Sequence, residues 1–214
     1  MTGTPGGPGV PTVIGVDAGS ADLRGADHLA QDLVARLGLP DATVACTHPV
    51  RSGDRPHIAV SLALPDADTA ASVWHRLVAL LPLLADEERP PSGAALGTLR
   101  HGPAPYADGA ALAAAEQQTR EQGRAVVYPG VQRLVGTVPM SFLLQHTAID
   151  RVTVVGAPSG PGSGPEPDTS VRTRDHVRPL WQGGQLVLPL VPAAGGLLAP
   201  FEVPDPTPCC ADHA

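Results

Sequence analysis

The spacing of apolar residues between positions 12 and 84 constrains the fold of this chain more than any other feature of its sequence. The spacing switches between the period of a strand and that of a helix, and alternation is clearest at Ile58, Val60, Leu62 and Leu64. In order, the segment predicts strand 12–17, helix 22–37, strand 42–47, strand 58–64 and helix 66–84. Two strands joined through a turn, each flanked by a helix, make up most of a ferredoxin-like α/β sandwich.

The rest of the chain predicts a second, smaller part of mixed structure. Residues 85–109 are polar and then rich in Pro and Gly, so we expect a linker or long loop, with residues 97–99 as a candidate fourth strand of the sandwich. Helices are expected over 109–122 and 140–146, and strands over 124–128, 151–155, 171–173, 177–181, 186–190 and 197–203. Pro189 and Pro200 fall inside the last two strands, which favours edge or bulged strands there.

These elements predict an α+β protein with four segments. They are a disordered leader (1–11), a ferredoxin-like α/β unit (12–99), a mixed α+β part with short antiparallel strands (109–203) and an extended tail (204–214). The leader has no basic residue and no apolar run, so it does not resemble a secretory signal. The apolar stretch at 73–84 is too short to span a bilayer. We therefore expect a cytoplasmic protein without a membrane partner.

Composition excludes several classes of function. All 14 basic residues are arginine, which rules out a Schiff-base lysine and the phosphate-binding lysine of a P-loop. The formal net charge is −7, the arginines are scattered, and aromatic residues make up 3% of the chain. Nucleic-acid binders need a basic face or stacking aromatic side chains. Nucleic acid is therefore not an expected partner.

Residues 15–20, which read Gly-Val-Asp-Ala-Gly-Ser, resemble the first phosphate loop of the sugar kinase and actin-like ATPase superfamily. The resemblance implies that Asp17 coordinates the metal-bound nucleotide and that the amides of Gly19 and Ser20 reach phosphate. In that superfamily a second strand follows the loop, whereas a helix is predicted here over residues 22–37. We therefore interpret the segment as a strand that runs into a helix cap, where the amides near Gly19 could hold an anion.

The C-terminal tail is the most unusual chemical feature. Cys209 and Cys210 are adjacent, and Cα atoms about 3.8 Å apart are too close for an unstrained disulfide. With His213 they offer two thiolates and an imidazole, which suit Zn or Cu, although the spacing is not that of a standard zinc finger. Disordered, incidental cysteines and redox use of the thiols are the alternatives.

Cys46 and His48 are the candidates for a second half of such a metal site. They are two residues apart on a predicted strand, so both side chains can face the same side. The alternative is that Cys46 is a small buried residue and that His48 ends the strand before Pro49.

Residues 172–178 form a local charge cluster on a predicted strand. Arg172, Arg174, His176 and Arg178 share one parity and would line one face, with Asp175 on the other. Such a face could bind an anion or an acidic partner, and a solvated strand face is the alternative.

Taken together, the sequence predicts a non-enzymatic, cytoplasmic protein that binds a small ligand or a protein partner and has an exposed Cys-Cys-x-x-His tail. The fold class does not decide function. Two alternatives stay open, namely soft-metal binding through the tail (with Zn or Cu as the cofactor) and thiol-dependent catalysis by Cys209 or Cys210.

Overall fold

The computed structural model of this protein describes residues 11–51, 56–84, 91–156 and 165–204. It mixes helix (33%) and strand (35%), as expected for an α+β protein. The chain forms two compact units. The first comprises residues up to Pro129 together with Trp181–Gly184, and the second comprises Gly130–Leu180 and the residues from Gln185 onward.

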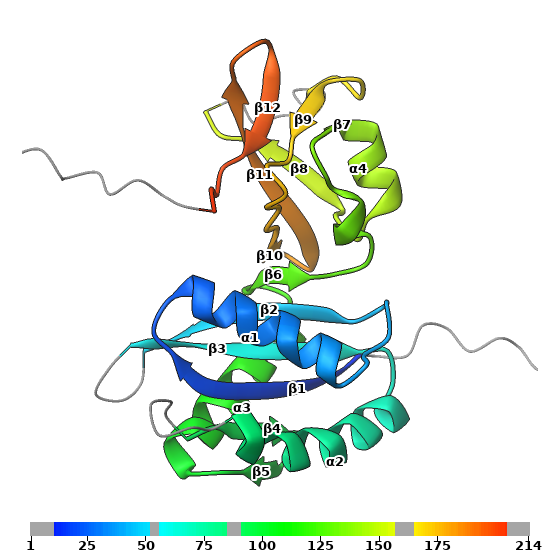
Figure 1. Cartoon of the computed structure of the whole chain (residues 1–214). Coiled ribbons are helices and arrows are strands. Elements are labelled where there is room, and N and C mark those ends of the chain that lie inside the picture. The colour runs from blue at the N-terminus through cyan, green and yellow to red at the C-terminus, as the bar shows by residue number, and fades with distance from the viewer. Residues whose placement is uncertain (1–10, 52–55, 85–90, 157–164, 205–214) are drawn as a thin grey trace, which may run out of the picture. The chain divides into compact units, whose positions relative to one another are not determined.

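The first unit is built on an antiparallel sheet (Figure 1). Its elements are β1 (Thr12–Ser20), α1 (Leu23–Arg36), β2 (Val44–Val50), β3 (His57–Leu64), α2 (Ala67–Leu84), β4 (Gly93–Leu96), β5 (Leu99–His101), α3 (Ala104–Thr119) and β6 (Arg124–Val127). The strands are ordered β5-β4-β1-β3-β2-β6, and Trp181 of β10 (Leu180–Gln182) follows beside β6. Neighbouring pairs from β5 to β6 are antiparallel.

The two faces of this sheet carry different side chains because neighbouring residues of a strand point to opposite sides. On one face lies the main apolar core, where strand residues such as Ile14 and Leu62 pack against Leu33 of α1 and Leu77 of α2. The other face is covered by α3, which lies against β1, β3 and β4 (Figure 1). The sheet is therefore the middle layer of three.

Helix α3 lies unusually close to the sheet. The Cα of Gly15 is so near the helix that an added Cβ would be 1.7 Å from the backbone oxygen of Ala110. A Cβ on Gly93 would likewise be 2.4 Å from the backbone nitrogen of Ala107. The helix side of the contact is made of small residues, with Ala110 and Ala113 fully buried. Glycine on the strands and alanine on the helix together permit this approach.

The second unit contains short strands and one α-helix. Its elements are η1 (Val131–Arg133), β7 (Thr137–Pro139), α4 (Met140–His146), β8 (Arg151–Val154), β9 (Ser170–Arg172), β11 (Gln185–Ala193) and β12 (Leu197–Pro200). β11 pairs with β8 in parallel and with β12 in antiparallel fashion, β12 pairs with β9, and β9 pairs with β7. The expected helix over 140–146 is thus α4. The expected strand over 197–203 is β12, and its partners are β11 and β9.

The region between 85 and 109 differs from the expected linker. Among its described residues it holds β4, β5 and the first turns of α3, which starts after Pro103. The candidate fourth strand at 97–99 is wrong, because Gly97 has a φ of 55° and lies in the turn between β4 and β5. The strand next to β1 is instead Gly93–Leu96. Since α3 packs on β1, the first compact unit extends to Pro129, beyond the expected limit at residue 99.

The expectation of an edge strand at Pro189 is also wrong. β11 has partners on both sides, and the Pro189 carbonyl still accepts a hydrogen bond from the Phe201 amide at 3.0 Å. Proline lacks the backbone N–H donor but keeps its carbonyl, so a strand position at which only the carbonyl is hydrogen-bonded tolerates proline.

We predict that Gly15→Ala destabilises the first unit by about 2–4 kcal/mol, because the new methyl group has to displace the backbone of α3. The control is Gly25→Ala within α1, where the nearest contact of a Cβ is 3.4 Å from Asp22 Oδ1. That change is expected to stabilise by roughly 0.5–1 kcal/mol. Urea unfolding monitored by circular dichroism measures both, and a Gly15→Ala protein as stable as the parent would contradict the close packing.

Candidate functional site

Polar side chains gather between the sheet and α3. Asp17 of β1, His48 of β2 and Ser61 of β3 all face this layer and are fully buried. His48 and Ser61 meet Glu116 and Gln117, which α3 places on its sheet side near its C-terminal end. Because a buried polar group needs a partner, these contacts decide which chemistry the layer can perform.

His48 lies between a hydroxyl and a carboxylate. Its Nε2 is 2.8 Å from Ser61 Oγ, and its Nδ1 is 2.9 Å from Glu116 Oε2. Ser61 also donates to Gln117 Oε1 at 3.4 Å. Hydroxyl, imidazole and carboxylate in this order have the geometry of an activated serine nucleophile. Here, however, Ser61 and His48 have no exposed surface, so a substrate cannot reach the hydroxyl in this arrangement.

A second histidine–carboxylate pair lies at the other end of α3. His57 Nε2 is 2.7 Å from Asp17 Oδ2, and the Gly19 amide donates to Asp17 Oδ1 at 2.8 Å. The carboxylate is fully buried and faces α3 and the backbone, in contrast to the accessible, metal-coordinating position that the phosphate-loop resemblance implies. Asp22 caps α1 by accepting from the Gly25 amide at 2.8 Å, as expected for a strand that runs into a helix cap.

On the opposite face of the sheet, a buried ion pair joins β6 to α1. Arg124 donates from Nη1 to Asp27 Oδ1 at 2.5 Å and from Nη2 to Asp27 Oδ2 at 3.1 Å. Thr47 Oγ1 lies 3.4 Å from Nη1. Two parallel bonds to one carboxylate fix both side chains, so this pair fastens β6 to α1.

The structure places Cys46 and His48 on the same side of β2, since both would meet a Cβ added to Gly123. Both ring nitrogens of His48 already have hydrogen-bond partners. Burial raises the pKa of the Cys46 thiol to about 12, against smaller opposing effects of Trp181 and Arg124, so Cys46 is a thiol at neutral pH and not the thiolate that metals bind. Within the described ranges, no group of three or more His, Cys, Asp or Glu is placed to hold a metal ion.

Cys209, Cys210 and His213 lie outside the described residues, so their part in a metal site stays a prediction. Zinc and copper analysis of the full chain and of a variant truncated after residue 203 tests it.

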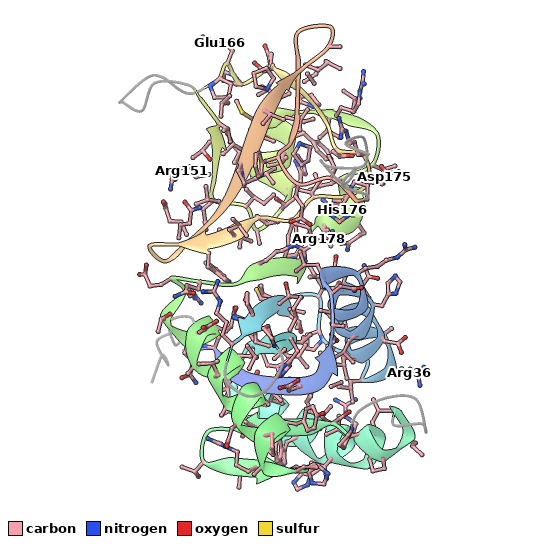
Figure 2. All side chains as sticks on the ribbon, turned by 90° about the vertical axis from the view of Figure 1, so that its left-hand side faces the viewer. Arg36, Arg151, Glu166, Asp175, His176 and Arg178 are labelled. Carbon is pink, nitrogen blue, oxygen red and sulfur yellow. The ribbon has the colours of Figure 1, made fainter. Side chains whose placement is uncertain are left out.

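The charge cluster at 172–178 is not a strand beyond Arg172. Figure 2 labels three side chains of this segment, Asp175, His176 and Arg178. Arg174 and Asp175 have φ of 55° and 53° and form a tight turn closed by the His176 amide and the Thr173 carbonyl at 3.1 Å. Asp175 Oδ1 accepts from the Gly136 amide, and His176 pairs with Glu202 at 2.9 Å. The expected single charged face is therefore wrong, because the turn breaks the alternation on which it rested.

Two grooves are lined by described residues of the first unit. One, of about 720 Å³, runs along α1 and is lined by Ala18, Gly19, Ser20, Gly25, His28, Leu29, Gln31, Asp32, Ala35 and Ser92. The other, of about 790 Å³, lies where α3 ends and is lined by Pro11, Val13, Ala42, Val44, Ala63, Leu64, Pro65, Gln117, Gln118, Arg120 and Trp181. We call the second the Trp181 groove.

The Trp181 groove combines an apolar floor with a few polar groups at its edge. Val13, Val44 and Ala63 pack together on the α3 side of the sheet and form the floor. The guanidinium of Arg120 lies 5.1 Å from the centre of the Trp181 ring, in a cation–π contact. An apolar surface with a few convergent polar groups is the usual composition of a small-molecule site.

Arg120 occupies a backbone position that favours glycine. It ends α3 with a φ of 54° and a ψ of 28°, in the left-handed region. A side chain in that conformation costs about 1–2 kcal/mol. The Arg120 carbonyl accepts from the Gly184 amide at 3.1 Å, which helps to hold the conformation. The fold therefore carries an arginine at this point at a cost in stability, and such strain is common at functional sites.

Sequence reasoning missed Ser61, Glu116, Arg120 and Trp181. Ser61 could have been found, because it interrupts one face of the alternating segment 57–64 with a hydroxyl. Glu116 lies in α3 and Arg120 is its C-cap, and seven of the 16 residues of this helix are alanine. The two faces of the helix therefore differ little in apolar character, and no periodic signal marks which side is buried. Trp181 joins the site from a distant part of the chain.

Comparison of this chain with protein-family models, with curated proteins and with solved structures gave no match. Across the part of the chain that the structure describes, no helix has both the length and the apolar character needed to cross a membrane.

We predict that Cys46 resists alkylation in the folded protein. In a Cys209→Ser/Cys210→Ser variant, iodoacetamide at pH 8 should leave Cys46 unlabelled, because the side chain is buried and its pKa is raised to about 12. Labelling should become complete in guanidinium chloride. Mass spectrometry measures both, and native labelling at the rate of a free peptide thiol would contradict the burial.

We also predict that Ser61 does not react with a fluorophosphonate probe, because its hydroxyl is enclosed. Ser61→Ala should cost about 1–3 kcal/mol of unfolding free energy, since it leaves a buried nitrogen of His48 without its partner. Probe labelling is read by mass spectrometry and stability by urea unfolding. Covalent modification of Ser61 in the folded chain would show that substrates can reach the arrangement of Ser61, His48 and Glu116.

Proposed function

We propose that this protein is a cytoplasmic, non-enzymatic ligand-binding protein and that its first unit, a ferredoxin-like sandwich with additions, binds a small organic molecule in the Trp181 groove. The order β4-β1-β3-β2, with α1 and α2 on one face, is the arrangement such a sandwich would have. β5, α3 and β6 are the additions, and α3 covers the face that the two other helices leave open.

The observation that carries the proposal is the arginine at the end of α3. Arg120 adopts a conformation that glycine would adopt without strain, and its guanidinium lies at the edge of an apolar groove, over Trp181. An interaction with a ligand accounts for keeping a side chain at this position. The contact with Trp181 alone contributes about 0.5–1 kcal/mol and does not exceed the backbone cost.

The burial of the acid–base groups supports binding rather than catalysis. Ser61 and His48 are enclosed and satisfy each other's hydrogen bonds, so their role is to fix α3 on the sheet. Gln117 links this buried group to the groove, because it contacts Ser61 and also lines the Trp181 groove. The groove wall is thus held by a rigid network, as a preformed binding site requires.

We predict that 1-anilinonaphthalene-8-sulfonate, a fluorescent apolar anion, binds the folded protein at one saturable site. Val44→Phe places a larger side chain on the half-buried floor and should weaken binding about tenfold or more. The matched control is Val135→Phe, at a site that is 63% exposed in the second unit, and it should bind as the parent does. A fluorescence titration measures all three proteins. Equal binding by the parent and by Val44→Phe would place the dye elsewhere and refute the groove as the site.

A further inference from the structure

The charge of the residues that line the Trp181 groove indicates which charge its ligand carries. Arg120 is the single charged residue among its described lining residues. The side chain is half-buried, so water screens its charge less than on an open surface. An apolar ligand with one negative group complements this lining, whereas a cationic ligand would meet the guanidinium at close range.

The number of cations favours a carboxylate over a phosphate. A guanidinium offers two parallel N–H donors that match the two oxygens of one carboxylate. A phosphate monoester carries close to two charges at neutral pH, and its sites generally use several cations or a helix N-terminus. The groove instead lies at the C-terminal end of α3, where the helix dipole is negative. Glu121, next to Arg120, and the net charge of −7 also repel anions, and they repel a doubly charged phosphate more strongly than a singly charged carboxylate.

The polar neighbours fit the same ligand. Gln117 is buried and its Oε1 accepts from Ser61, so it holds the groove wall. Gln118 is exposed and lines the same groove as Arg120, so its amide can offer an N–H donor to a carboxylate oxygen. Val13, Val44 and Ala63 supply the apolar lining for the body of the ligand.

We infer that the ligand of the Trp181 groove is a monocarboxylate with an apolar body, held by Arg120 at its acidic end and by the strand floor along its length. This inference rests on the proposed function, since it names the ligand class of the same groove. It assigns Arg120 as the residue that determines specificity, not only as a part of the wall.

The test uses three probes that share one apolar body, namely 4-phenylbutyrate, 4-phenylbutanamide and 4-phenylbutyl phosphate. Each is titrated against the full chain by its displacement of 1-anilinonaphthalene-8-sulfonate. We expect the carboxylate to bind about tenfold or more tightly than the amide, and more tightly than the phosphate. In Arg120→Gln, the preference for carboxylate over amide should fall to within about threefold, while the amide itself is little affected.

A second variant separates binding from folding. Arg120→Gly removes the guanidinium and relieves the left-handed backbone, so its unfolding free energy should stay within about 1 kcal/mol of the parent. It should nevertheless lose the preference for carboxylate. Loss of preference in a protein of parental stability identifies the side chain as the cause.

The outcomes distinguish the inference from the proposed function. Displacement by the amide as strongly as by the carboxylate, or tightest displacement by the phosphate, overturns the inference and leaves a ligand-binding groove. An unchanged carboxylate preference in Arg120→Gln also overturns it. If none of the three probes displaces the dye, the carboxylate inference fails, and the proposed function then depends on the Val44→Phe result alone.

Discussion

The contact between the backbone of α3 and the sheet determines the rest of the first unit. It exists because Gly15 and Gly93 have no side chain where the helix passes, and because the helix presents alanines there. This layer is thin, so it contains little apolar volume between its two small clusters. The space between them is taken by hydrogen-bonded polar side chains. A close helix and a polar interlayer are thus two consequences of the same small residues.

The polar interlayer in turn positions the groove. Ser61, His48 and Glu116 fix the last turns of α3, and Gln117 extends this network to the groove wall. The helix then ends at Arg120, and Val13, Val44 and Ala63 of the sheet line the groove beside that end. Ser61, His48 and Glu116 therefore have the geometry of a catalytic arrangement but a structural role. Catalysis would also require that a substrate can reach the Ser61 hydroxyl, and this hydroxyl is buried. The buried layer thus fixes α3 on the sheet, and the ligand site that we propose lies at its edge.

The sequence predicted the elements whose periodicity is strong and missed those without it. The alternation at 58–64 and the amphipathic helix at 22–37 predicted β3 and α1 nearly to their ends, because large apolar residues lie on one face of each and smaller or polar residues on the other. The prediction of a strand at 97–99 was wrong because Gly97 lies in a turn between two short strands. The prediction of a strand through Arg174 was wrong because a left-handed turn made of non-glycine residues leaves no sequence signal. The candidate site was beyond prediction for another reason. Its members come from strands, from an alanine-rich helix and from Trp181, and only the fold brings them together.

A crystal structure of the full chain with 4-phenylbutyrate is the most direct test of this account. The account predicts the carboxylate within hydrogen-bonding distance of the Arg120 guanidinium and the phenyl ring over Val13, Val44 and Ala63, with α3 still packed on Gly15. Density for the ligand along α1 instead, or a ligand whose carboxylate points away from Arg120 into solvent, would contradict it.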